Sequence, residues 1–531
     1  MGGARRLLYR RAVPALPFLP TQRLVVTAPD GVGVTESLAR TSSVRRELPQ
    51  GTIVVCAETE GEGSRARVRT SSPAGWVDAD ALGPAPAPRA LRFSRDEFAE
   101  RHASPAGGER YGLEFPFTLD SIRTQGADFL TEAFRAAGTL SPDNRVTTIE
   151  SVEVCEGGQA SDKGFLTVAY ERSEPGLSER LFVKVPSSDN ERKFFLADTV
   201  PFEVEFARLS AGGALPFAVP RYYYGDYSAR TSNYLLITDA VPFGEQGIAP
   251  ACFKGYDHLL PDARERYLLL ARALADLAAA HKNGELGADL ELIFPYPRNA
   301  PRSRPAPGME AKLDGLVRFI GERAPNLFPD WATKPDFLNT FRADVLFGLT
   351  HGDALATWLH ADVDYVGLCH PNLNLDNAWF WRDDADALCA GLLDWGMTRQ
   401  MAYAQAMTGM LMFPEPEPYR ELVHQVIATF IDELERSGGR RLDPLKVRQQ
   451  LQVSLFMSTI GMVLGILVDQ LDRFSDAEYR SMPDRFDSRL LETGACAGVI
   501  WIRNVLEEWA HETTPGEACR AALEESGAGD L

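Results

Sequence analysis

Residues 369–396 read CHPNLNLDNAWFWRDDADALCAGLLDWG and hold two polar clusters, 370–377 and 394–396, each beside an apolar run. The polar segment WRDDADA separates the apolar runs 378–380 and 391–393, a pattern that predicts a β-hairpin. Such a hairpin would bring Asn377, at one end, beside Asp394, at the other. Two neighbouring oxygen ligands suit Mg²⁺, which phosphoryl-transfer sites hold with one or two protein oxygens and phosphate. The stretch therefore predicts phosphoryl transfer.

The composition limits the partners of the chain. With 531 residues, a formal net charge of −19 and a pI near 5.0, the protein lacks the overall basic character that nucleic acid or an anionic membrane requires. A local basic pocket remains compatible with these values. The seven cysteines are scattered and without CxxC spacing, which predicts neither a disulfide framework nor a zinc site. We therefore expect a reducing compartment, the cytoplasm.

Two segments bear on targeting and membranes. Residues 1–22 carry four arginines and no acid, as in an organellar presequence, but three prolines would break its helix, so a plain tail is the favoured interpretation. The apolar run 453–468 is short for a membrane span and contains two serines and a threonine. It predicts a buried core helix, and we expect no membrane span.

Residues 23–83 form short β-type runs separated by turn residues, among them LVVT, TIVVC, RARVRT and GWVDADAL. The segments SSVRRELPQGTIV and GWV resemble the bacterial-type Src-homology-3-like barrel. The resemblance implies a small all-β binding or spacer module and leaves a peptide or a glycan open as its ligand. GPAPAP then begins a Pro-rich linker, predicted to cover 84–122.

Three further β-type runs follow at 148–154, 165–170 and 181–185. Between the first two lies EGGQASDKG, where Gly157 and Gly158 would let backbone N–H groups approach a phosphate. Lys184 stands mid-strand among apolar residues in LFVKVP. An unpaired ammonium there would be costly to bury, so the lysine needs a partner.

A helix predicted to begin near Pro201 offers that partner as Glu203 or Glu205. A Gly-rich turn, a strand lysine and a helix glutamate in this order match the upper lobe of the kinase-like fold, in which the lysine holds nucleotide phosphates and the glutamate holds the lysine. Glu203 is preferred because it opens EVEF, like the Glu-Val-x-Phe of that fold's small-molecule members. The strand YLLI then leads into the expected hinge beside adenine, formed by Thr238, Asp239 and Ala240.

The remainder reads as largely helical. Residues 262–282 carry a buried stripe that includes His281, which is therefore predicted to be a core-edge histidine rather than a base. Further helices are predicted at 309–348, 419–437, 444–471 and 489–509.

The span 123–509 resembles the aminoglycoside phosphotransferase and choline kinase-like group, in its ecdysteroid-kinase-like branch. The motifs that carry the resemblance are GGQASDKGF, LFVKVP, FEVEFARL, VPRYYYGDY, YLLITDA, HPNLNLDN and LLDWG. It implies an α+β, bilobal protein-kinase-like fold, with a small β-rich lobe at 123–240, a large helical lobe at 241–512 and a C-terminal tail at 513–531. It also implies ATP and Mg²⁺ as cofactors and a small-molecule hydroxyl as acceptor.

By this resemblance, His370 matches the structural histidine of the catalytic loop, Asn377 its metal-binding asparagine and Asp394 the principal magnesium ligand. The chain departs from the pattern at Asn372, where the group has an aspartate as catalytic base. An amide cannot accept the proton of the attacking hydroxyl.

Two aspartates could substitute for the missing base. Asp353 belongs to HGD, the group's own letters, but Trp358 rather than an asparagine follows five residues later, which marks it as a decoy. Asp376 adjoins the metal-binding asparagine, where loop hydrogen bonding is the favoured role.

Losing a general base costs about 10² to 10⁴ in rate. Since kinases turn over at roughly 1 to 100 per second, about 10⁻⁴ to 1 per second would remain. Three hypotheses follow: a small-molecule kinase in which Asn372 positions the acceptor, a nucleotide-binding pseudokinase, and an interaction protein whose working part is the N-terminal barrel. The motifs do not name the acceptor.

Overall fold

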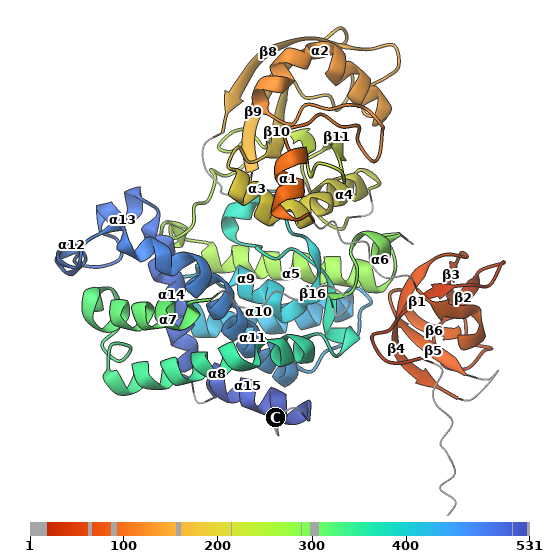
Figure 1. The fold of residues 1–531 in the computed structure, drawn as a ribbon. Coiled ribbons are helices and arrows are strands. Elements are labelled where there is room, and N and C mark those ends of the chain that lie inside the picture. The colour runs from red at the N-terminus through yellow and green to blue at the C-terminus, as the bar shows by residue number, and fades with distance from the viewer. Residues whose placement is uncertain are drawn as a thin grey trace, which may run out of the picture.

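The computed structural model describes residues 18–61, 66–85, 93–155, 161–213, 215–287, 289–297, 307–511 and 513–527. Three bodies are visible in Figure 1: a small β module in red, a mixed lobe in orange and yellow, and a large helical lobe in green to blue. The mixed lobe lies above the helical lobe, and the β module packs against the side of the helical lobe.

The β module is an antiparallel sheet with a core of short aliphatic side chains. Its strands are β1 (Arg23–Val26), β2 (Val32–Thr35), β3 (Val44–Leu48), β4 (Ile53–Glu60), β5 (Arg67–Ser71), β6 (Ala74–Asp78) and β7 (Leu82–Pro84). They are ordered β3-β2-β6-β5-β4-β1-β7, around Leu24, Val54 and Val68. A small all-β module was predicted here; its likeness to the Src-homology-3 barrel stays a prediction.

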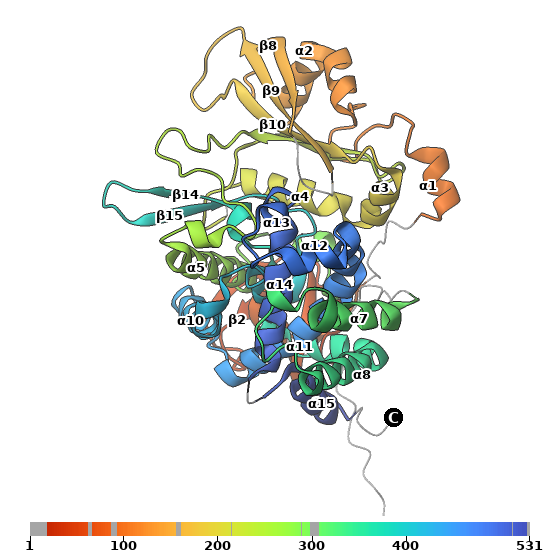
Figure 2. The ribbon, with the colours of Figure 1, turned by 90° about the vertical axis from the view of Figure 1, so that its left-hand side faces the viewer.

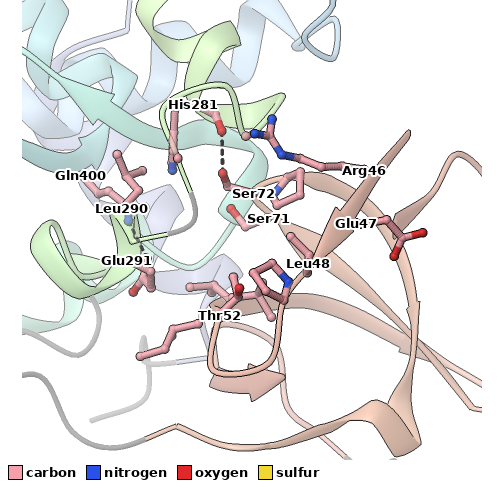
Figure 3. A pocket seen from close by; sticks show the side chains of 17 residues that line it. Arg46, Glu47, Leu48, Thr52, Ser71, Ser72, His281, Leu290, Glu291 and Gln400 are labelled. Atoms are coloured by element: carbon pink, nitrogen blue, oxygen red, sulfur yellow. Dashed lines mark hydrogen bonds between the residues drawn. The ribbon is translucent and has the colours of Figure 1, made fainter. Parts of the chain in front are cut away.

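Ionic contacts attach this module to the helical lobe. Arg23 of β1 donates to the buried carboxylate of Glu291 at 2.9 Å. Arg69 of β5 binds both oxygens of Asp364, at 2.9 and 3.1 Å. A cavity of about 170 Å³ lies between the two bodies, with Glu291 on one wall and β-module residues on the other (Figure 3).

The mixed lobe is built on a five-stranded antiparallel sheet of order β11-β12-β10-β9-β8. Its elements are α1 (Arg95–Arg101), α2 (Leu119–Ala136), β8 (Val146–Val154), β9 (Ser161–Tyr170), β10 (Arg180–Pro186), α3 (Asn190–Leu196), α4 (Val200–Ala211), β11 (Tyr222–Tyr227) and β12 (Tyr234–Asp239). Helix α2 packs on β8 and β9, and α4 packs on β11 and β12. In Figure 2, α4 lies between the sheet and the helical lobe.

The prediction of a linker over 84–122 needs correction for its second half. A capping box between Ser94 and Glu97 starts α1. The buried carboxylate of Asp226 then accepts hydrogen bonds from the backbone N–H groups of Arg110 and Tyr111, at 3.0 and 2.9 Å. These bonds fix the segment onto the mixed lobe, although its polar composition resembles that of a linker.

The helical lobe contains two small antiparallel strand pairs among its helices. Its helices are α5 (Ala263–Lys282), α6 (Leu290–Ile293), α7 (Met309–Arg318), α8 (Pro335–Leu359), α9 (Tyr403–Met410), α10 (Pro416–Arg436), α11 (Pro444–Ser458), α12 (Asp476–Ser481), α13 (Ser488–Glu492), α14 (Ala495–Trp509) and α15 (Pro515–Glu525). Its strands are β13 (Val366–Cys369), β14 (Ala378–Arg382), β15 (Leu388–Leu392) and β16 (Arg399–Ala402), paired as β13–β16 and β14–β15.

The predicted C-terminal tail after residue 512 is wrong in part, because α15 packs on α8 and α11. Its small apolar face, which includes Ala518, Cys519 and Leu523, is buried in the helical core. The sequence PGEACRAALEE has few large apolar residues, so its helical pattern is easily missed.

Helix α11 continues through the π-helical segment Thr459–Leu467 to Arg473. Among the described residues, Pro444–Arg473 is the helix long and apolar enough to cross a membrane, and 56% of its apolar window is buried inside the protein. Val453, Phe456 and Val463 belong to the core of the helical lobe. A partly buried helix of this kind is weak evidence for a span.

Together the two lobes have the bilobal kinase-like fold. A five-stranded antiparallel sheet with one helix on the cleft side is joined through the end of β12 to a lobe dominated by helices. The β14–β15 hairpin lies at the boundary of the lobes, at the left in Figure 2.

We predict that Glu291→Ala destabilises the protein by about 3–5 kcal/mol, because Arg23 would stay buried without its carboxylate. Urea denaturation measures the change. The control is Glu36→Ala, which breaks the exposed pair of Arg45 and Glu36 and should cost less than about 1 kcal/mol. Equal small losses in both variants would contradict the structural role of the buried pair.

Candidate active site

The β14–β15 hairpin places the two predicted oxygen ligands close together. Ala378 pairs with Leu392, and the N–H of Leu393 donates to the carbonyl of Asn377 at 3.0 Å. Asp394 follows directly after this last rung, so it lies beside Asn377. The predicted hairpin is confirmed.

Lys184 lies at the centre of the cleft between the lobes. Its Nζ donates to Glu203 Oε1 and to Asp394 Oδ1, both at 2.7 Å. Lys184 is 3% exposed and Glu203 8%. The bonds therefore join β10 and α4 of the mixed lobe to the end of the hairpin in the helical lobe. Glu205 is turned away and pairs with Arg110 instead.

Lys184, Glu203 and Asp394 shift one another's pKa values. Burial acts to lower the pKa of Lys184, but the carboxylates of Asp394 and Glu203 raise it well above its usual range. Lys184 holds the pKa of Asp394 well below its usual range, against the effect of burial. Burial raises the pKa of Glu203, against the effect of Lys184. An ammonium and an ionised Asp394 are thus the stable states.

His370 fixes the loop that follows β13. Its Nδ1 accepts the backbone N–H of Asn372 at 3.1 Å, which places the ring proton on Nε2, and Nε2 donates to the carbonyl of Leu393 at 3.0 Å. Burial lowers the pKa of His370, in keeping with a neutral ring. The histidine therefore ties the loop to the residue before Asp394.

Trp395 holds Asp394 in position from the other side. Its ring stacks on Phe206 of α4 at 3.7 Å between centroids and on Phe217 at 5.6 Å, and it contacts His370 edge-on at 4.7 Å. Asp394 has a φ of 62°, which is uncommon for a residue other than glycine. Such a conformation persists where neighbouring packing enforces it.

Asn372 lies on the floor of the cleft, where it lines the same cavity as Lys184 and Asp394. Its side-chain oxygen accepts a hydrogen bond from Asn374, and its carbonyl accepts one from Asn377 Nδ2 at 2.7 Å. The amide of Asn377 is thereby oriented, with its nitrogen toward the loop and Oδ1 left as an oxygen ligand.

The donor set around the hairpin fits Mg²⁺. Asp394 offers the carboxylate oxygen that Lys184 does not bind, and Asn377 offers Oδ1. Among the described residues, no group of three or more His, Cys, Asp or Glu side chains could hold a metal by itself. Two protein oxygens completed by phosphate and water suit Mg²⁺ in a nucleotide site.

The structure describes only some of the other residues that were predicted to bind the nucleotide. Gly157 and Gly158 lie outside the described residues. Thr238, Asp239 and Ala240 lie at the end of β12, where the N–H of Ala240 donates to Arg180 at 3.2 Å. They lie at the junction of the lobes, as a hinge does, but are not among the residues that line the large cavity around Lys184.

Neither of the two aspartates considered as substitute bases lines the cavity with Asn372. Asp353 is an exposed residue of the continuous helix α8 and does not line the cleft. Asp376 forms an ion pair with Lys254 at 3.0 Å. Burial raises its pKa and Lys254 lowers it, and Asp376 does not line the cavity either.

Three basic residues of the site escaped the sequence prediction. Lys163 of β9 lies directly opposite Lys184 in the ladder, hence on the same face of the sheet. Lys254, from the segment before α5, and Arg399 of β16 line the cavity with Asn372. The alternation in SDKGFLTV could have placed Lys163 on the face opposite the apolar residues Leu166 and Val168. Lys254 and Arg399 could be placed in the site only from the fold.

The cavity that begins at Lys184 has a volume of about 780 Å³. It extends from α4 and the loop after β13 past α9 to α11, the π-helical segment and α14. Its size is within the range of pockets that enclose a small molecule.

Comparison with known proteins yields matches among solved structures. No family model and no curated protein match the sequence. A macrolide 2'-phosphotransferase type I is 16% identical, with 69% of this chain and 99% of that chain covered and a TM-score of 0.35. A spectinomycin phosphotransferase in complex with ADP and spectinomycin is 13% identical, with 75% and 98% covered and a TM-score of 0.36. A Plasmodium vivax ethanolamine kinase is 12% identical, with 63% and 81% covered and a TM-score of 0.36.

Such low identities and TM-scores transfer no activity to this chain. The kinase-like assignment rests on its own sheet order, on the contact of Lys184 with Glu203 and on the hairpin that carries Asn377 and Asp394.

We predict that Lys184→Met destabilises the protein by about 3 kcal/mol at pH 7, the low end for a broken buried pair because Asp394 is partly exposed. The loss should shrink as the pH falls toward about 4. In the wild type, the lowered pKa of Asp394 stabilises the folded protein above about pH 4, and this stability is lost as the pH falls further. In the variant, the carboxylates of Asp394 and Glu203 have no counter-charge. They take up protons as the pH falls, which removes the destabilising charge.

Urea denaturation at pH 7 and pH 5 provides the measurement. The control is Lys312→Met, which breaks the exposed pair with Asp469 and should show a loss below about 1 kcal/mol at both pH values. A Lys184→Met loss that grows on acidification would be incompatible with this electrostatic account.

Proposed function

We propose that the protein is an ATP- and Mg²⁺-dependent phosphotransferase of the small-molecule kinase type, which phosphorylates a hydroxyl group. The observation that carries the proposal is the contact of Lys184 with both Glu203 and Asp394 in one cleft. A cation of this kind, held by a helix glutamate and set beside a metal-ligand aspartate, suits a nucleotide triphosphate and its metal.

Each residue has a role in this proposal. Lys184 binds the phosphates, and Glu203 orients it. Asn377 and Asp394 hold Mg²⁺, which when bound neutralises charge on the phosphates. Gly157 and Gly158 supply backbone N–H groups to the phosphates, and Thr238, Asp239 and Ala240 contact the adenine of the nucleotide. Lys163, opposite Lys184, adds a second positive charge on the roof of the cleft.

His370 keeps the catalytic loop in register with Asp394, and Asn372 faces the acceptor. The Asn372 amide can orient a hydroxyl by hydrogen bonding, but it cannot take the proton. Slow turnover through positioning and electrostatics is therefore the expected regime.

A nucleotide-binding pseudokinase is the second candidate. The observation that favours it is that, among the described residues, the carboxylates lining the cavity are Glu203 and Asp394, both bound to Lys184. Of the described carboxylates that line the cavity with Asn372, neither is left to act as a base. A third possibility, an interaction role for the β module with a peptide or glycan, has no specific contact in its favour.

Location and other partners also remain proposals. We infer a cytoplasmic protein, with support from the cysteines that the structure describes, none of which forms a disulfide. Nucleic acid is disfavoured by the net charge of −19. The burial of part of Pro444–Arg473 supports a core helix rather than a membrane span.

We expect Mg²⁺-dependent ATP binding that Lys184→Met weakens by at least about tenfold and that Asp394→Asn makes insensitive to Mg²⁺. Calorimetric titration with ATP, with and without Mg²⁺, measures both effects. Arg45→Gln in the β module serves as the control and should bind like the wild type, because Arg45 is far from the cleft in an exposed pair. A wild-type protein that binds no nucleotide at millimolar ATP would exclude both the kinase and the pseudokinase.

Asn372→Asp should raise the rate of phosphate transfer from ATP to a hydroxyl acceptor by about 10² to 10⁴, because it restores a proton acceptor. Phosphate transfer from labelled ATP to a panel of alcohols gives the readout. Turnover in the variant beside an inert wild type would favour the pseudokinase. Equal rates would show that the position does not act as the base.

A further inference from the structure

The large cavity beyond Lys184 is mostly apolar. Its deep walls come from α9, α11, the π-helical segment and α14, and Figure 2 shows α13 and α14 below α4. Its apolar lining includes Met401, Met412, Phe413, Met457, Met462, Ile466 and Trp501. Methionine side chains adapt to an irregular ligand surface, so these walls suit a flexible apolar body.

The charged residues of the cavity are mainly basic, in a chain whose net charge is −19. The described lining contains the cations Lys184, Lys254, Arg399 and Arg473 and the anions Glu203 and Asp394. The sign of the local charge is therefore opposite to that of the whole protein. An acidic chain that keeps a basic cavity has a site suited to an anion.

The two carboxylates of the cavity are already occupied, because both bind Lys184. A cationic acceptor such as an amino alcohol would thus meet two lysine-bound carboxylates and several positive charges. To bind either carboxylate, this acceptor would have to break an ion pair that the carboxylate already forms with Lys184. The cavity is arranged against a cationic acceptor.

Arg399 differs from the other cations. Lys254 pairs with Asp376, and Arg473 donates to the carbonyl of Thr493 at 2.7 Å. Among the described residues, the guanidinium of Arg399 has no hydrogen bond or ion pair. An arginine fork without a partner in the lining of a cavity is suited to bind a carboxylate in two-point fashion.

The position of Arg399 relates this anion site to the reacting group. Arg399 pairs with Cys369 across β13 and β16, and Cys369 directly precedes His370 of the catalytic loop. Met401, two residues further on the same strand, lines the apolar part. A ligand that contacts Arg399 therefore has its acidic group near the loop and its apolar part toward α11 and α14.

We propose that the acceptor is an amphipathic hydroxy acid, whose carboxylate binds Arg399, whose nearby hydroxyl faces Asn372 and whose apolar chain fills the methionine-lined part of the cavity. This inference rests on the proposed phosphotransferase function. It adds the substrate class, and it assigns Arg399 as the residue that selects for negative charge.

Binding of a matched set of probes tests this assignment without turnover. The probes are β-hydroxydecanoate, the diol in which a hydroxymethyl group replaces its carboxylate, and the amino alcohol in which an aminomethyl group replaces it. Each is titrated calorimetrically into the full chain saturated with Mg²⁺ and ADP. The wild type should bind the hydroxy acid at least about tenfold more tightly than the diol, and the amino alcohol weakest.

Arg399→Gln should remove the preference for the acid while affinity for the diol stays the same, and Arg399→Lys should restore part of the preference because charge returns without the planar fork. Arg45→Gln, an exposed arginine of the β module, is the matched control and should keep the wild-type order.

Three results would overturn the inference: equal binding of the three probes, preference for the amino alcohol, or no binding of any probe to the wild type. A fourth is an Arg399→Gln variant that loses affinity for Mg²⁺ and ATP but not for the hydroxy acid, which would assign Arg399 to the phosphates. Failure of the phosphotransferase proposal looks different, since the wild type would then bind no ATP at all.

Discussion

The ammonium of Lys184 is the interaction on which the arrangement of the two lobes depends. It is buried, and its cost of burial is offset by one carboxylate from α4 and another from the end of the β14–β15 hairpin. Because these carboxylates belong to different lobes, the lysine defines the cleft as well as occupying it. The stacking of Trp395 on Phe206 crosses the same boundary with apolar surface. Charge and packing thus fix Asp394 in one place.

Much of this site was predictable because local rules demand it. A lysine in the middle of an apolar strand must have a counter-charge, and the helix predicted to begin near Pro201 offered two glutamates. The hairpin followed from alternating apolar runs around a polar turn. The sequence alone therefore predicts that Asp394 and Asn377 lie side by side.

Other parts depend on contacts between distant segments, which a single sequence does not encode visibly. Arg23 and Glu291 are separated by 268 positions, and the sequence around either residue does not predict the pair. Lys163 lies in the site because the register of β9 and β10 places it opposite Lys184. Arg399 stands in a short strand whose partner, β13, is formed by an equally short run. Helix α15 was missed because small residues such as Ala518 and Ala522 give a weak apolar stripe.

The docking of the β module has a consequence that reaches the loop after β13, which holds His370 and Asn372. Ser72 of the module donates to the carbonyl of His281 at 2.5 Å, and His281 Nδ1 accepts the N–H of Leu368, two residues before His370. On the same face, Gln400 of β16 donates to Glu291, the residue that holds Arg23. The module and the loop therefore share a chain of hydrogen bonds. If a ligand of the module shifts the loop after β13 through these bonds, thermodynamic reciprocity requires that a ligand of the loop change the affinity of the module by the same factor.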